Sequence, residues 1–337
     1  MLVLGIETSC DETGVALYSE RGLLVDLTRT QDVHRAFGGV VPELAARDHI
    51  KVLPRLVKAA LEEAGVEAPQ AVAVTAGPGL AGALAVGVSF AKTYAQALGV
   101  PLVGVNHLEA HVLSVLLEKE IEFPFLALLA SGGHTEIVLA EELFSYKVLG
   151  RTLDDAAGEA FDKVAKILGL GYPGASRLEE VAREGNEEAY DFPVPKLGFN
   201  FSYSGLKTAV YYAVKRGGEG ALAERLADLA ASFQRAAVQQ LLDVVRGAVE
   251  ETGVRRVAVV GGVARNSYLR EKFSKEGYEV IFPSPRFSSD NGAMVALTGY
   301  LRLGDGFRSS LELGVYPDLE LESSDSLYFP FGKGSKG

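Results

Sequence analysis

Two histidines four residues apart carry the clearest chemistry in this sequence. Residues 107–111 read His-Leu-Glu-Ala-His, so His107 and His111 would lie on one face of a helix. Two imidazoles on one face suit a single metal ion, although the pair could equally cap a helix or pack at an interface. A metalloprotease would need a glutamate directly after the first histidine or directly before the last, and Glu109 is in neither place. The spacing therefore disfavours a peptidase.

Asp290, in the polar run Ser289-Asp290-Asn291, is a candidate third ligand. Two histidines and one carboxylate leave coordination positions open for water or substrate, and they suit Fe(II) or Zn(II). The set predicts a catalytic metal site rather than a structural one. Asp290 could instead cap the helix expected to begin near Asn291, and a capping role would not exclude ligation.

Two glycine-rich turns have the composition of loops that approach a phosphate or carbonyl oxygen. Residues 131–135 read Ser-Gly-Gly-His-Thr between two expected strands, where a plain hairpin turn would look similar. Residues 261–266 read Gly-Gly-Val-Ala-Arg-Asn between a buried strand and a helix. That position favours a nucleotide site at a helix N-terminus, or simply close packing of helix on strand.

Two further segments leave both a functional and a structural interpretation open. Residues 154–166 are typical of a helix with Phe161, Val164 and an isoleucine at 167 inward, and Asp162 beside that face could hold ribose hydroxyls or be a solvated charge. The turn at 38–43 precedes Arg47 and His49, which could contact RNA or belong to ordinary surface packing.

The elements that would position these residues occur twice along the chain. Each half contains three short apolar runs, then a fourth strand, a glycine-containing turn, a helix and a fifth strand, and this periodicity predicts strands alternating with helices. In the first half the expected strands are 2–6, 14–18, 23–27, 71–75 and 102–105; in the second they are 125–130, 136–140, 146–149, 257–260 and 278–282. The pattern predicts two duplicated α/β lobes.

We expect the lobes to face each other across a central cleft, with ligands beyond the carboxyl ends of the strands. The predicted division is 1–104 plus 295–325 for the N-terminal lobe and 105–294 for the C-terminal lobe, which would carry the metal and nucleotide site. Residues 326–337 are expected to form a flexible tail. By the duplication, His107 and Asp290 occupy equivalent loops on opposite lobes and would meet across the cleft.

Composition limits the possible partners. The 337 residues carry a formal net charge of -11, which opposes indiscriminate binding to nucleic acid, so an RNA partner would need a local basic patch or a helper protein. The single Cys10 cannot form an internal disulfide, and a small residue in a tight turn is favoured over a reactive thiol. From the apolar and polar patterning we expect neither a secretory leader nor a membrane span, and therefore a cytoplasmic protein with no membrane partner.

Taken together, these residues resemble the TsaD family, the bacterial counterpart of the catalytic subunit of the KEOPS complex. The resemblance covers nearly the whole chain and includes residues 5–13, 38–43, 77–79, 106–111, 131–135, 154–163, 201–208 and 289–291. It implies the actin-like ATPase (ASKHA) fold, with mixed sheets covered by helices. It also implies transfer of a threonylcarbamoyl group from threonylcarbamoyl-AMP to N6 of adenosine 37, next to the anticodon, in tRNAs that read ANN codons.

The same resemblance implies site residues. The metal ligands would be His107, His111 and Asp290, holding one divalent ion, Fe(II) ahead of Zn(II). The contacts to threonylcarbamoyl-AMP, or to ATP or AMP in its place, would be Leu129, Ala130, Ser131, Gly132, Gly133, Asp162, Ala175 and Asn266. Ala175 stands where the family usually has glycine, so a backbone contact there requires a negative φ.

Bacterial members of the family act with TsaB, an inactive relative, and TsaE, a small ATPase, and this implies partners of both kinds besides tRNA. Two other functions remain as alternatives for the same fold. An ATP-dependent kinase would use Mg(II) and need no paired histidines, and a nucleotide-switched scaffold would need no catalytic metal at all.

Overall fold

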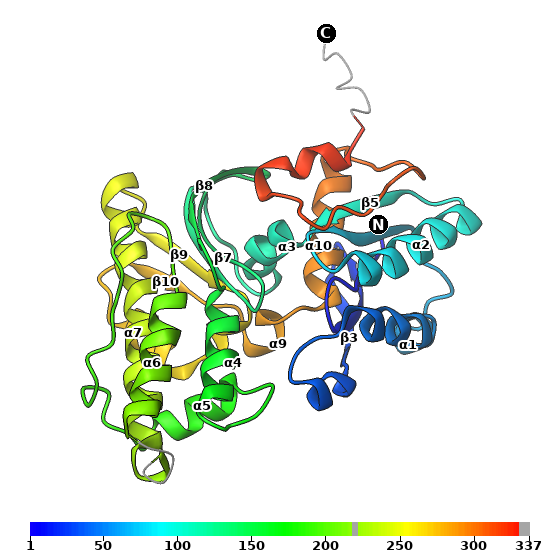
Figure 1. Cartoon of the computed structure of the whole chain (residues 1–337). Coiled ribbons are helices and arrows are strands. Elements are labelled where there is room, and N and C mark those ends of the chain that lie inside the picture. The colour runs from blue at the N-terminus through cyan, green and yellow to red at the C-terminus, as the bar shows by residue number, and fades with distance from the viewer. Residues whose placement is uncertain (218–221, 330–337) are drawn as a thin grey trace. The chain divides into compact units, whose positions relative to one another are not determined.

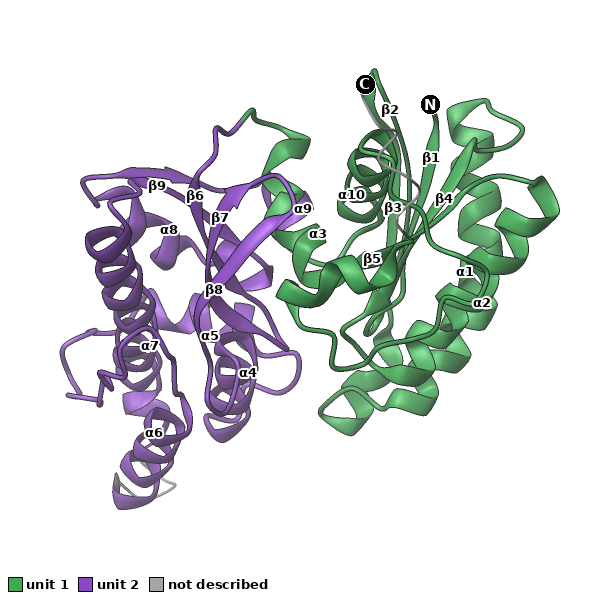
Figure 2. Ribbon diagram, turned by 90° about the horizontal axis from the view of Figure 1, so that it is seen from above, with its two compact units in different colours: residues 1–120, 289–337 green, residues 121–288 purple. Residues whose placement is uncertain are grey.

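The computed structural model describes residues 1–217 and 222–329, which divide into two compact units. Unit 1 comprises residues 1–120 and the chain from 289 onward, and unit 2 comprises residues 121–288 (Figure 2). Each unit contains a five-stranded mixed sheet and its own hydrophobic core.

The sheet of unit 1 has the strand order β3-β2-β1-β4-β5, and Figure 1 labels its two edge strands, β3 and β5. Its strands β1, β2 and β3 are antiparallel neighbours, whereas β4 and β5 run parallel to β1. Every residue of β1, β4 and β5 is buried, as expected for strands covered on both faces. The strands are β1 (Val3–Glu7), β2 (Glu12–Ser19), β3 (Gly22–Thr30), β4 (Ala71–Gly77) and β5 (Leu102–Asn106).

Helices pack on this sheet. Figure 2 shows α1 and α2 along one face and α10 along the other. These helices are α1 (Pro42–Ala64), α2 (Ala81–Leu98) and α10 (Gly292–Gly304); the shorter ones are η1 (Asp32–Phe37), α3 (His107–Leu113), η2 (Ser114–Leu117) and η5 (Leu321–Leu327). No helix in the described ranges is long and apolar enough to cross a membrane.

Unit 2 repeats the same sheet. Its order, β10-β9-β6-β7-β8, is that of unit 1 when β6 is matched to β1, and the parallel and antiparallel pairings match as well. The strands are β6 (Phe125–Ala130), β7 (Thr135–Glu142), β8 (Ser145–Arg151), β9 (Arg256–Val260) and β10 (Glu279–Ile281). The sequence prediction of two duplicated lobes is therefore confirmed at the level of topology.

The long helix α7 (Leu222–Thr252) contacts β6 and β7 of this sheet and also packs against α5 and α6. The other helices of unit 2 are α4 (Ala157–Ile167), α5 (Ala175–Ala182), α6 (Ser204–Gly217), η4 (Gly262–Arg265), α8 (Ser267–Ser274) and α9 (Pro285–Ser288).

The division of the chain differs from the predicted one. Residues 105–120 and 289–294 belong to unit 1 instead of the C-terminal lobe. The physical reason is that α10 covers β1, β2 and β4, and α3 in turn packs against α10. Of the predicted tail at 326–337, residues 326–329 are ordered against unit 1, where the Phe329 amide donates to the Arg308 carbonyl; residues 330–337 lie outside the described ones.

Candidate metal centre and nucleotide loops

Helix α3 presents both histidines of the predicted pair. It begins where β5 ends, and the Asn106 side chain caps it by accepting hydrogen bonds from the amides of Leu108 and Glu109. His107 and His111 are one turn apart and buried, with ring centroids 4.7 Å apart. The Asn106 cap and the burial of α3 fix the directions of the His107 and His111 rings.

Asp290 reaches the pair from the segment that precedes α10. Asn291, not Asp290, caps that helix, since its side chain accepts from the Met294 amide. The helix start lies close to β2 because Gly14 and Gly292 face each other: a Cβ on Gly14 would come within 2.5 Å of the Gly292 nitrogen. This close approach lets Asp290 stand beside α3 with its carboxylate free of the capping role.

The three side chains converge within unit 1. The Asp290 Oδ1 is 2.9 Å from His111 Nε2 and 3.5 Å from His107 Nε2, and the three candidate ligand atoms all lie within 4.8 Å of one another. Nitrogen and oxygen ligands at such spacing fit a divalent transition metal. The prediction that Asp290 would come from the opposite lobe is wrong, because both segments belong to unit 1.

Glu7, which sequence reasoning did not select, holds His107 from the other side. Its Oε2 is 3.1 Å from His107 Nδ1 and accepts from the Thr75 hydroxyl at 2.6 Å, and its second oxygen accepts from the Ser9 amide. The carboxylate is fully buried at the end of β1. A signal existed in the sequence, since a glutamate that ends an otherwise apolar strand needs a buried partner.

Electrostatics within this group agree with the geometry. Burial alone would lower the pKa of His107, but the carboxylates of Asp290 and Glu7 outweigh it and raise that pKa to about 9. Burial likewise raises the pKa of Glu7, but its contacts with His107 reverse the shift and leave the pKa below its ordinary value. Glu7 is therefore a charged acceptor that fixes which nitrogen of His107 faces Asp290.

His111 has no comparable support. Its Nδ1 is buried and has no hydrogen-bond partner among the described residues, whereas its Nε2 faces Asp290. The two candidate histidine ligands are thus held differently. The His107 imidazole contacts a carboxylate through each of its ring nitrogens, whereas the His111 imidazole contacts a carboxylate of the described residues only through Nε2.

Helix α3 is fixed from behind by a buried ion pair. Glu109 lies between the two histidines in sequence and pairs with both Arg302 Nε, at 3.2 Å, and Arg302 Nη2, and both side chains have no exposed surface. Arg302 also bonds Asp325 and lies over the rings of Phe307 and Tyr328. Helix α3 is therefore linked through Arg302 to α10 and to the last described segment of the chain.

Cys10 lies in the turn between β1 and β2. Burial, together with the nearby Asp11 carboxylate, raises the pKa of its thiol far above the ordinary range. The preferred interpretation of a residue packed in a turn therefore agrees with the structure. His49 holds this turn in place, because its Nε2 is 2.8 Å from the Cys10 carbonyl and its Nδ1 is 2.8 Å from the Thr13 hydroxyl.

In unit 2, the predicted loop 131–135 meets two other backbone segments. The Gly158 amide at the start of α4 donates to the Ser131 carbonyl, and a Cβ on Gly261 would come within 2.4 Å of the Ala130 carbonyl oxygen. Glycine is thus required for these segments to approach. By contrast, a Cβ on Gly132, Gly133 or Gly262 would meet nothing within 4 Å, so these glycines border open space.

The remaining predicted contacts have structural partners of their own. Asp162 Oδ1 accepts from the amides of Gly174 and Ala175, at 2.8 and 2.9 Å, and so fixes the start of α5. Ala175 has a negative φ, which meets the condition set by its side chain. Asn266 caps α8 and donates to Gln234, so its amide is committed to holding the loop after β9.

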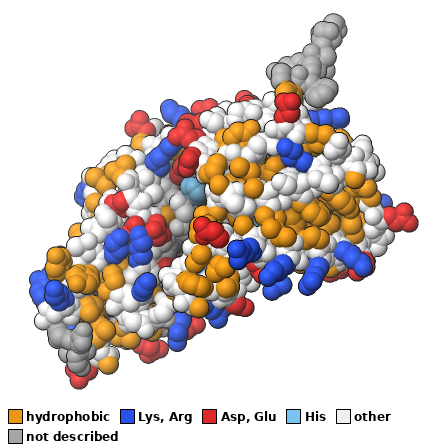
Figure 3. All heavy atoms as spheres, turned by 45° about the vertical axis from the view of Figure 1, so that its right-hand side comes forward, with side chains coloured by type: hydrophobic (Ala, Val, Ile, Leu, Met, Phe, Trp, Pro, Cys, Tyr) orange, Lys and Arg blue, Asp and Glu red, His pale blue; other side chains and the backbone are white. Residues whose placement is uncertain are grey.

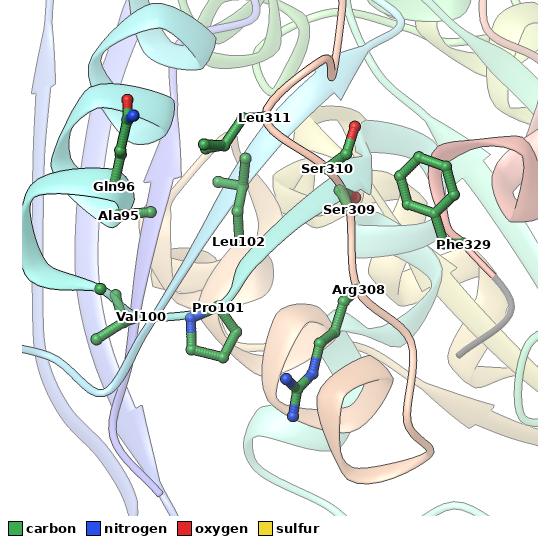
Figure 4. A pocket seen from close by; sticks show the side chains of 11 residues that line it. Ala95, Gln96, Val100, Pro101, Leu102, Arg308, Ser309, Ser310, Leu311 and Phe329 are labelled. Carbon is green, nitrogen blue, oxygen red and sulfur yellow. The ribbon is translucent and has the colours of Figure 1, made fainter. Parts of the chain in front are cut away.

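A hollow of about 690 Å³ in unit 1 is not part of this centre. It lies at the start of β5, whereas His107 follows the end of that strand, and Figure 4 shows Leu102, Ser309 and Phe329 around it. A second hollow, of about 430 Å³, is lined mainly by apolar residues of α1 and α2, on the hydrophobic face seen in Figure 3.

The chain matches a family model and curated relatives of the same name. Residues 22–297 match the family model described as TsaD: tRNA N6-adenosine threonylcarbamoyltransferase. Two curated relatives with that name, from Geotalea uraniireducens (strain Rf4) and Thermotoga neapolitana, are each 48% identical to this chain. The alignments cover 96% of this chain and 97% of the first relative, and 95% of this chain and 100% of the second.

Solved structures show the fold class. HypF from T. kodakarensis superposes with a TM-score of 0.64 at 16% identity, over 90% of this chain and 48% of that one. The activator of the 2-hydroxyisocaproyl-CoA dehydratase from Clostridium difficile superposes with a TM-score of 0.52 at 15% identity, over 90% and 96%. Both have actin-like ATPase folds, so the predicted fold class is confirmed.

Proposed function

Because this chain belongs to the TsaD family of tRNA N6-adenosine threonylcarbamoyltransferases, we propose that it transfers threonylcarbamoyl from threonylcarbamoyl-AMP to N6 of adenosine 37 in tRNAs reading ANN codons. A divalent metal held by His107, His111 and Asp290 would serve the reaction. The observation that carries this proposal is the convergence of those three side chains around one point in unit 1.

The ligand set fits Fe(II), with Zn(II) as the alternative, because imidazole and carboxylate suit both ions. Asp290 is part-exposed while the histidines are buried, which supports an open position on the Asp290 side. When bound, such an ion supplies a Lewis acid that polarises a carbonyl or phosphoryl oxygen.

The residues of unit 2 would bind the adenylate. Leu129 and Ala130 end β6 at the turn of Ser131, Gly132 and Gly133, where the open space beside the glycines suits a phosphate or a bound carbonyl. Asp162, Ala175 and Asn266 would act mainly by shaping the neighbouring loops, since their polar groups already bond within the protein. AMP held there would be the leaving group.

The adenine amine is a weak nucleophile, so the protein's task is to hold a reactive carbonyl still beside it. The mixed anhydride supplies the reactivity. The backbone amides of the glycine loops and the buried imidazoles are already oriented, so they would hold the reactive carbonyl in place without rearranging during the reaction.

The acidic chain would work with other proteins. A TsaB-like paralogue and a TsaE-like ATPase are the proposed partners. Because the net charge of -11 opposes binding of tRNA by this chain alone, it supports binding of tRNA together with such partners. A protein that modifies tRNA would act in the cytoplasm, where tRNA is found.

The test is transfer from synthetic threonylcarbamoyl-AMP to an unmodified tRNA transcript, with anaerobically purified protein and the partner proteins. We expect His111→Ala to lose bound metal and at least about 100-fold in transfer rate. His34→Gln is the control, because this imidazole is also buried and bonds Gln31 and the Val41 amide, away from the candidate ligands.

Two outcomes would reject the proposal. Mg(II)-dependent phosphorylation of a small molecule by a protein without Fe or Zn would favour a kinase. Full tRNA modification in cells that carry a folded His111→Ala protein would favour a nucleotide-switched scaffold.

A further inference from the structure

Helix α1 carries a row of basic side chains on its exposed face. Arg47, Lys51 and Arg55 follow one another at intervals of four residues, and all three are exposed. Residues four apart advance by about 40° around an α-helix, so the three lie within about 80° of arc and about 12 Å of length. We call these three residues the basic ridge.

The orientation of the ridge is fixed by the opposite side of the helix. His49, Leu53 and Val57 are buried there, and His49 bonds the Cys10 carbonyl and the Thr13 hydroxyl. The basic side chains therefore point to solvent. Figure 3 shows Lys and Arg side chains in a row beside the hydrophobic face, at the level of α1.

The three ridge side chains are not ion-paired within the described ranges, although acidic residues outnumber basic ones by 44 to 33 in the chain. Lys58 extends the row but is 3.6 Å from Glu62 on the same helix. Like charges four residues apart destabilise a helix, so the arrangement works against the stability of α1 itself.

Resting on tRNA as the substrate, we propose that the basic ridge binds the phosphate backbone of that tRNA. Unpaired cations in a line on one rigid helix match the regular charges of an RNA strand. The helix that carries the ridge also fixes, through His49, the turn that follows β1. An RNA strand bound to the ridge would therefore be bound by the same unit that contains the candidate metal ligands.

The test compares two variants with the same change in charge. Arg47→Gln/Lys51→Gln/Arg55→Gln removes the ridge, and Arg183→Gln/Lys272→Gln/Lys275→Gln removes three cations of unit 2 that are ion-paired. Binding of an unmodified tRNA transcript is measured over a series of salt concentrations. Melting temperature and metal content serve as checks of folding.

We expect the ridge variant to bind tRNA at least tenfold more weakly in low salt. Its plot of log affinity against log salt should become shallower by about two to three units, because each phosphate contact contributes about 0.7–0.9. The control variant should resemble the wild type. Arg47→Lys/Arg55→Lys should retain binding, because a point charge suffices for a phosphate.

Equal affinities and slopes in the two triple variants would overturn the proposal. So would unchanged tRNA binding combined with loss of assembly with a partner protein, which would make the ridge a protein-binding surface. The transfer assay distinguishes failure of the ridge proposal from failure of the proposed transferase function. The ridge variant should have a higher KM for tRNA with little change in kcat. A wild-type protein that transfers nothing would refute both the ridge proposal and the transferase function.

Discussion

At the residue scale, the candidate ligands differ in how they are supported. His107 has a buried carboxylate behind it, whereas the Nδ1 of His111 has no partner among the described residues. A carboxylate behind a ligating imidazole fixes the ring and raises its basicity. Metal affinity should therefore depend on Glu7 although Glu7 is not one of the candidate ligands.

We expect Glu7→Gln to weaken binding of Fe(II) or Zn(II) by about 10–100-fold, the usual effect of removing such support. Glu7→Ala should weaken it further, because the Thr75 hydroxyl and the Ser9 amide also lose their acceptor. Competition with a chelator of known affinity measures the change. Glu43→Gln, a change at an exposed residue of the same unit, is the control. Equal metal affinities of folded Glu7→Gln and wild-type protein would contradict the prediction.

Glu7 also illustrates what the sequence could not provide. Residue types and spacing selected His107 and His111, and the duplicated pattern together with the family resemblance added Asp290 as a candidate third ligand. The role of Glu7 depends on β1 and β4 being neighbours and on the direction of His107, which are facts of tertiary structure.

At the scale of elements, two polar anchors join segments that are distant in the sequence. One is the buried pair of Glu109 and Arg302, which joins α3 to α10. The other is Asp154, whose carboxylate accepts from the hydroxyls of Ser202 and Ser204 and from the amides of Tyr203 and Ser204 at the start of α6.

Breaking the first anchor on one side should be costly. Arg302→Met removes the cation that pairs with the buried Glu109 carboxylate, and we expect it to lower the free energy of unfolding by about 3–5 kcal/mol. The double variant Glu109→Gln/Arg302→Met should recover part of that loss, since no buried charge remains. Urea unfolding measures both, and a double variant as unstable as the sum of the single ones would show that the pair is not coupled.

The second anchor should give a pH-dependent contribution to stability. Partial burial would raise the pKa of Asp154, but its four hydrogen bonds reverse this and lower the pKa from 3.8 to about 2. A pKa that is lower in the folded state means that the contribution is complete above pH 3.8 and is lost as pH falls toward 2.

We therefore expect Asp154→Asn to destabilise the protein at pH 7 by about 1 kcal/mol, a modest value because the carboxylate is partly solvated. The difference from wild type should shrink as unfolding is measured at successively lower pH below 4. A difference that stays constant down to pH 2 would contradict the assigned role.

The strands were the part of the fold that the sequence predicted best, and β6 matches its predicted range of 125–130. Others begin or end a few residues away; β3, for example, extends to Thr30, because pairing with β2 continues beyond its apolar run. Periodicity records burial of side chains, whereas a strand ends where its backbone pairing ends.

At the scale of the whole molecule, the duplication predicted the two sheets but misplaced the boundary between units. The equivalence of the segments around His107 and Asp290 suggested opposite lobes. The glycine contact between Gly14 and Gly292 decides otherwise, since it lets α10 pack on the first sheet. A pattern of apolar residues does not reveal which of two similar sheets a helix covers.

That arrangement has a consequence for biosynthesis. A ribosome makes β1 and the histidine pair early, then all of unit 2, and only afterwards Asp290 and the helix that closes the first sheet. An interrupted product that stops before residue 289 would carry both imidazoles without their carboxylate and a sheet with one face bare. The candidate ligand set is thus assembled only in a polypeptide that has been translated almost to its end.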